Sequence, residues 1–323
     1  MTLTFYYRFD ILKKMSRATE KKQNRIQKRK ELMGYLLLLI SVLSGTAKGY
    51  CGKKISGYTN HYMDALVANS LRMGMCIIIG FLLVVFGEGI SDLIPGGITV
   101  LISALSGIST AVFLVSWLLS VRQGAYIMVE VLLMLGLLIP VLFGMVLFGN
   151  QVSAKQWMGI FLLVLAAYVM CSYHISVKGK LTSKAILTLI ACGLSNGVTD
   201  LSQKLFAEYG SDSALLFNFY TYLFTGIILV FLLQTGKKSA SPTVKLREIF
   251  GYLLVMAICL FSGSFFKTLA ANYLDPIQLY PLCQGVALIL STLMASFCFR
   301  EKMTKRSGFG ILLAFGGLLL IHG

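Results

Sequence analysis

Long apolar runs separated by short polar segments make up most of this chain. A helix that crosses a bilayer needs about 20 apolar residues. Runs of about that length span 33–52, 63–86, 98–120, 124–148, 154–174, 184–206, 213–234, 249–271, 276–298 and 304–322. Because these runs are continuous rather than alternating, they predict helices and not strands. The connections are short, so we expect an all-α membrane protein whose ten transmembrane helices are antiparallel neighbours in a bundle.

The last predicted helix repeats one from the middle of the chain. Residues 148–170 read FGNQVSAKQWMGIFLLVLAAYVM, and residues 299–321, which begin 151 positions later, read FREKMTKRSGFGILLAFGGLLLI. At this spacing Gly159 aligns with Gly310 and Leu162 with Leu313. Weaker matches connect earlier helices: Leu43-Ser44 with Leu194-Ser195, Lys53 with Lys204 and, at a slightly shorter spacing, Asn69 with Asn218.

Five predicted helices fall in each half of the chain. Because five is odd, the second half must enter the membrane from the opposite side. The halves are then two inverted five-helix repeats related by an axis in the membrane plane, an arrangement found in transporters. We therefore expect a basic tail over residues 1–32, a first repeat over 33–174, a linker over 175–183 and a second repeat over 184–323.

The composition agrees with a membrane protein. Hydrophobic residues make up 57% of the chain and charged residues 13%, whereas soluble domains carry roughly 25% charged residues. The formal net charge is +16, with the excess in the first 32 residues and in the loops. This distribution favours contact with anionic lipid headgroups over nucleic acid, and the sequence carries no nucleic-acid recognition motif.

The sequence offers little support for an enzyme or a metal site. None of the seven cysteines forms a C-x-x-C pair, and most lie in apolar runs, which is typical of small buried hydrophobic residues. His61, His174 and His322 are far apart in the sequence. Neither H-E-x-x-H nor G-x-S-x-G occurs. We therefore expect no enzymatic activity, no cofactor and no bound metal.

The charge pattern gives two conflicting signals on orientation. The basic segment before the first helix favours a cytoplasmic N-terminus. That orientation would place other basic residues outside, among them Lys53, Lys54, Lys178, Lys180, Lys237, Lys238, Lys245, Arg247, Lys302, Lys305 and Arg306.

The polar turn and glycine-containing apolar helix that close each half, residues 150–168 and 301–320, resemble the EamA-type members of the drug/metabolite transporter superfamily. Glu301 stands where that family usually has an acidic residue, and Asn150 departs from that pattern. Arg72 matches a common family arginine. The resemblance covers about residues 33–322. It implies ten helices in an inverted repeat, cytoplasmic termini and a central cavity between the halves.

Ionisable residues in hydrocarbon cost at least about 2.5 kcal/mol each on insertion scales, so each is a candidate for function. Glu130 lies within an apolar run, where burial favours a protonated carboxyl suited to proton coupling or to binding a substrate amine. Lys267 and Lys48 could bind a substrate carboxylate or phosphate, or extend toward the membrane surface. Arg72 lies nearly midway along the second predicted helix, where a structural role is the alternative.

Asp200 has two candidate partners. A bridge to Lys48 is disfavoured, because inverted halves would place the two residues toward opposite leaflets. Lys204, four residues further along the same helix, is the more plausible local partner.

Several uncharged residues complete the set of candidates. Asn69, Asn218, Tyr126 and Gln284 could line an inner face, with interhelical packing as the alternative. Pro140 removes one backbone hydrogen bond from the fourth predicted helix and is either a fixed bend or a hinge.

These observations predict a secondary active transporter of the plasma or inner membrane that moves a small, drug-like or metabolite solute by alternating access. Cationic residues outnumber acidic ones among the deep positions, which favours an anionic or amino-acid-like substrate. A flippase for a lipid-linked substrate is the alternative. Expected partners are the small-molecule substrate, membrane lipids and, in a coupled mechanism, protons; the sequence is compatible with a monomer or a homodimer.

Overall fold

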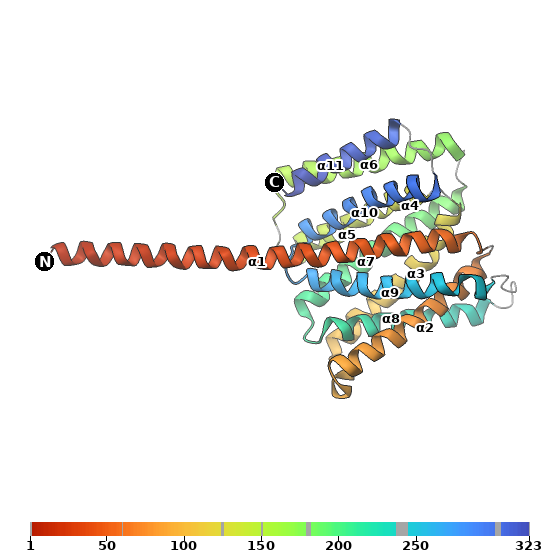
Figure 1. Cartoon of the computed structure of the whole chain (residues 1–323), viewed down its shortest axis with the longest axis horizontal. Coiled ribbons are helices and arrows are strands. Elements are labelled where there is room, and N and C mark those ends of the chain that lie inside the picture. The colour runs from red at the N-terminus through yellow and green to blue at the C-terminus, as the bar shows by residue number, and fades with distance from the viewer. Residues whose placement is uncertain are drawn as a thin grey trace.

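The computed structural model is a helical bundle (Figure 1). It describes residues 2–59, 61–123, 126–149, 151–178, 182–236, 245–300 and 305–322. The helices are α1 (Thr2–Ser56), α2 (Tyr62–Gly87), α3 (Gly97–Gln123), α4 (Tyr126–Leu133), α5 (Leu138–Phe148), α6 (Ala154–Lys178), α7 (Ser183–Tyr209), α8 (Ala214–Gly236), α9 (Leu246–Ala270), α10 (Pro276–Phe299) and α11 (Lys305–His322), with 3-10 turns η1 (Ile90–Leu93) and η2 (Met134–Leu137). No strand occurs within these ranges, and the predicted all-α class is confirmed.

Seven described helices are long and apolar enough to cross a membrane: residues 28–56 of α1, α2, residues 97–122 of α3, α7, α8, α9 and α10. Three shorter apolar helices, Leu138–Phe148, Ala154–Ala166 and Gly308–Ile321, lie where the fourth, fifth and tenth spans were predicted. The protein is therefore a multi-pass membrane protein. The first span is continuous with the basic tail, because α1 begins at Thr2.

The fourth predicted helix, 124–148, is not one continuous α-helix. It is divided into α4, the 3-10 turn η2 and α5, and Pro140 lies in the first turn of α5. Pro140 has no N–H to offer the carbonyl of Gly136, which explains a break at this point. The Gly136 carbonyl oxygen lies against α7 at Gly197, where an added Cβ atom would be only 2.3 Å from it. The bend therefore lies beside a close contact between η2 and α7.

The packing of the helices has the symmetry of an inverted repeat. The most extensive contact pairs α1 with α9, the first helix of one half with the third helix of the other. The same exchange pairs α7 with α3, which is also among the three largest contacts. The second helices of the two halves, α2 and α8, pack together, and so do the last helices, α6 and α11. Each half therefore contributes equivalent helices to equivalent contacts.

Both ends of the chain lie on the same side of the bundle (Figure 1). We call this the terminal side, and the opposite side, where α1 ends and α2 begins, the distal side. Since consecutive helices alternate in direction, α1 runs toward the distal side and α7 toward the terminal side. Asn150 and Glu301 lie outside the described residues, as do residues 179–181 of the predicted linker. The rest of that linker includes the end of α6, which extends to Lys178.

Candidate functional site

A cavity of about 130 Å³ lies in the middle of the bundle between the two halves. Helices α1, α3 and α4 of the first half and α7 to α10 of the second half line it. Its polar lining comprises Ser41, Thr46, Lys48, Thr110, Glu130, Asn196, Thr199, Asp200, Gln203, Ser264, Lys267, Gln284 and Ser291. Val42, Phe113, Trp117, Leu133, Tyr222 and Leu260 are among the residues that form its walls. The cavity is thus shared by both repeats.

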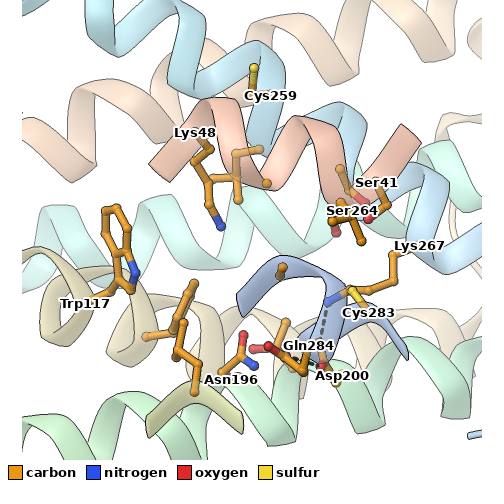
Figure 2. Close-up of a pocket in the computed structure, with 18 of the residues that line it drawn as sticks. Ser41, Lys48, Trp117, Asn196, Asp200, Cys259, Ser264, Lys267, Cys283 and Gln284 are labelled. Carbon is orange, nitrogen blue, oxygen red and sulfur yellow. Dashed lines mark hydrogen bonds and ion pairs between the residues drawn. The ribbon is translucent and has the colours of Figure 1, made fainter. Parts of the chain in front are cut away.

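An ion pair from the second half lies at one end of the lining. Lys267 Nζ of α9 donates to Asp200 Oδ1 of α7 at 2.5 Å, and Gln284 Nε2 of α10 donates to Asp200 Oδ2 at 3.4 Å (Figure 2). The Tyr280 hydroxyl donates to the Asp200 backbone carbonyl at 2.5 Å. Asp200 is fully buried. A buried carboxylate requires such partners, and here they join three helices around one side chain.

Lys48 of α1 presents a different environment. Its ammonium lies 5.4 Å from the centre of the Phe113 ring and 6.0 Å from that of Trp117, distances at which aromatic faces attract a cation. Among the described side chains, no carboxylate lies within 4 Å of Lys48 Nζ. Figure 2 shows the side chain extending into the cavity. The cavity therefore contains an ammonium group available to an anion.

Glu130 of α4 supplies the acidic group nearest to Lys48 in the first half. The side chains of Trp117, Tyr126 and Ser291 are its polar neighbours, and Lys48 is its charged neighbour. Trp117 comes from α3 and Ser291 from α10, so the carboxyl contacts both halves. Each half thus brings one lysine and one carboxylic acid to the shared cavity.

Two predicted candidates lie outside the cavity. Asn69 and Arg72 of α2 are not among the lining residues, although both are at most 2% exposed. Arg72 Nη2 donates to Asn69 Oδ1 at 2.5 Å, and Asn69 Nδ2 donates to the Leu114 carbonyl at 3.1 Å. These contacts join α2 to α3. The pair occupies a packed helix interface rather than the cavity wall.

Two further candidates lie just behind the wall. Asn218 Oδ1 accepts a hydrogen bond from the lining residue Ser264 at 2.6 Å, and Asn218 Nδ2 donates to the Ala214 carbonyl. Tyr126 is 1% exposed and lies within reach of Glu130. Of the predicted residues, Lys48, Glu130, Asp200, Lys267 and Gln284 line the cavity itself.

The local pair predicted for Asp200 is wrong. Lys204 Nζ lies 2.6 Å from Glu208 Oε1 and donates to the Ala271 carbonyl at 3.0 Å. Asp200 instead pairs with Lys267, which is distant in sequence. The expectation that Lys48 and Asp200 do not form a bridge is confirmed for this structure, although both line the same cavity.

Sequence reasoning did not single out several polar lining residues. Thr199, Gln203, Ser264 and Ser291 are small or uncharged, and nothing in their immediate sequence distinguishes them from interhelical packing residues. The alignment of the two halves gave one indication that Thr199 lines the cavity. At the 151-residue spacing Thr199 aligns with the predicted candidate Lys48. Both lie on the first helix of their half, and both line the cavity.

Comparison with known proteins gives one matching family and one listed structure of similar fold. The EamA-like transporter family matches residues 183–323, the whole of the second half. No curated protein matches the chain in sequence. A solved structure, entitled only as the crystal structure of a protein, superposes with a TM-score of 0.64 at 15% identity and covers 91% of this chain and 96% of its own; it supports the fold alone. The second half of the chain is therefore similar to the EamA-like transporters of the drug/metabolite transporter superfamily.

Proposed function

We propose that this protein is a secondary active transporter that moves a small solute carrying an anionic group, such as an amino-acid-like metabolite, through the central cavity by alternating access. The observation that carries the proposal is Lys48, whose ammonium extends into the cavity and meets aromatic faces rather than a described carboxylate. A substrate anion at this position would complete the coordination of a desolvated cation.

The cavity also offers acidic side chains to the rest of a substrate. Glu130 and Asp200 also line the cavity, and both are carboxylic acids. A zwitterion could therefore bind its anionic group at Lys48 while an ammonium group faces a carboxylate. The cavity volume of about 130 Å³ favours a compact solute over a large one.

Binding to the purified protein tests this proposal. A thermal-shift screen against amino acids, sugars, nucleotides and cationic dyes should show stabilisation by anionic or zwitterionic compounds, because a ligand that binds the folded state raises its apparent stability. For the best compound, Lys48→Gln should weaken binding at least tenfold, and Lys48→Arg, which retains the charge, should weaken it less. Stabilisation by cationic dyes alone, or equal binding by Lys48→Gln, would contradict the proposal.

The flippase alternative requires a path by which a lipid-linked headgroup enters from the side. The described surface has an apolar groove between α2 and α8, lined by residues that include Ser70, Gly74, Gly226 and Gln234. It shares no described lining residue with the central cavity. This separation favours a soluble substrate, and flux of the screened compound in reconstituted vesicles, compared with translocation of a labelled lipid, distinguishes the two functions.

A further inference from the structure

Two aromatic side chains, Trp117 and Tyr126, pack directly against the backbone of α1 next to the cavity. A Cβ atom added at Gly49 would lie within van der Waals overlap of the Tyr126 hydroxyl, and one added at Gly52 would overlap the Trp117 ring. Trp117 and Tyr126 are 2% and 1% exposed. Only glycine at these two positions allows the rings to approach α1 this closely.

The rings continue as a layer across the bundle. Trp117 and Tyr126 meet edge to face at 6.5 Å between centroids, Tyr126 lies 6.4 Å from Phe299 of α10, and Phe299 stacks on Tyr50 of α1 at 5.5 Å. Along α1 the cavity is lined by residues no later than Lys48, and along α10 by residues no later than Ser291. The layer therefore lies between the cavity and the distal side.

The internal repeat relates this contact to another at the opposite end of the cavity. At the 151-residue spacing Gly49 falls on Asp200 and Gly52 on Gln203. Asp200 pairs with Lys267 of α9, and Gln203 Nε2 donates to Ser264 of α9 at 3.0 Å.

One of the two pairs of positions also matches in the helices it joins. Gly52 and Gln203 each lie on the first helix of their half and contact the third helix, at Trp117 of α3 and Ser264 of α9. Gly49 contacts Tyr126 of the fourth span, whereas Asp200 pairs with Lys267 of α9. Because the halves are inverted, equivalent contacts lie toward opposite sides of the membrane.

The ion pair lies toward the terminal side. Lys267 is three residues from the end of α9, which runs toward that side, and it is the last residue of α9 in the lining. Tyr280, whose hydroxyl bonds to the Asp200 carbonyl, lies in the second turn of α10, which starts there.

We propose that these two contacts are the paired gates of the transporter. Trp117 and Tyr126 on Gly49 and Gly52 form the distal gate, and the Asp200–Lys267 pair forms the terminal gate. Both contacts are made in this structure. Each gate joins helices that otherwise contact each other little, since α1 packs chiefly on α9 and α3 chiefly on α7. Separation of the α1–α9 pair from the α3–α7 pair would therefore open one gate at a time. This inference rests on the proposed alternating-access function.

Accessibility of a cavity cysteine tests the gates without any substrate. Cys259 of α9 lines the cavity and is partly exposed. A variant that keeps Cys259 and replaces the other six cysteines would be reconstituted in sealed vesicles. A membrane-impermeant thiol reagent is then applied from one side at a time, with the side assigned by a terminal tag.

Gly52→Ala in this background should raise the labelling rate of Cys259 from the distal side at least fivefold, because the added methyl group displaces Trp117. Tyr126→Leu, which removes the other ring from the gate, should act in the same direction and guards against a folding defect of the glycine variant. Lys267→Gln should raise labelling from the terminal side instead. Gly251→Ala is the matched control, since that exposed glycine of α9 has no neighbour within 4 Å of an added Cβ.

Faster labelling from the side opposite to the one predicted, or unchanged labelling in the Gly52→Ala and Tyr126→Leu variants when both elute as folded protein, would overturn the gate assignment. If Lys48→Gln loses substrate binding while the gate variants label Cys259 at the unaltered rate, the proposed function stands and the gates are rejected. The reverse result would uphold the gates and reject the role of Lys48.

Discussion

Lys267 of α9 donates to the carboxylate of Asp200 of α7 at 2.5 Å, across 67 residues of sequence. The second half thus brings a closed ion pair to the cavity. The first half brings Lys48 and Glu130, which the structure leaves more than 4 Å apart. The inverted repeat is therefore symmetric in its helix packing and asymmetric in its charge pairing.

Removing one member of the buried ion pair should destabilise the protein. Asp200→Asn would leave the Lys267 ammonium, 15% exposed, without its carboxylate. Breaking a buried pair in this way costs about 3–5 kcal/mol. The double variant Asp200→Asn with Lys267→Gln should recover a large part of that loss. Thermal unfolding in detergent measures both, and equal melting temperatures for the single variant and the natural chain would contradict the pairing.

Glu130 is a candidate for proton coupling, with binding of a substrate amine as its alternative role. Glu130→Gln keeps a hydrogen-bonding group facing Trp117, Tyr126 and Ser291 but cannot exchange a proton. We expect uptake driven by an imposed pH gradient in vesicles to fall to the background rate, while exchange of substrate without a gradient persists. Gradient-driven uptake that equals that of the natural chain would remove Glu130 from the coupling step.

Asn69 and Arg72 should affect stability rather than substrate binding. Asn69→Leu removes the acceptor 2.5 Å from Arg72 Nη2 and leaves a buried guanidinium short of a partner. A buried donor without its acceptor costs about 1–3 kcal/mol. The melting temperature should fall, while the Kd for the best screened compound stays within threefold of its natural value. A large loss of affinity in the folded variant would place this pair in the binding site after all.

The inverted topology can be tested with reporter fusions. A reporter after Gly149 should lie in the compartment of the two termini, and one after Arg300 in the opposite compartment, because an odd number of spans separates them. With the termini in the cytoplasm, as we propose, the Gly149 fusion is cytoplasmic. The same compartment for both fusions would exclude antiparallel halves.

The sequence by itself determined the helical class, the approximate positions of the spans and the repeat, because span length and continuous apolarity are local properties. It also identified the charged residues, since any ionisable side chain in hydrocarbon is conspicuous. It also predicted a bend at Pro140 in the fourth span, but not that the bend takes the form of the 3-10 turn η2, where Gly136 makes a close contact with α7.

Only the tertiary structure decided which of these residues meet. The exchange of first and third helices between the halves brings Lys267 to Asp200, whereas Lys204 extends along its own helix to Glu208. The same packing places Asn69 and Arg72 at the α2–α3 interface and Lys48 in the cavity. Such contacts join residues distant in sequence, and their choice depends on which helix faces pack together, which no local pattern specifies.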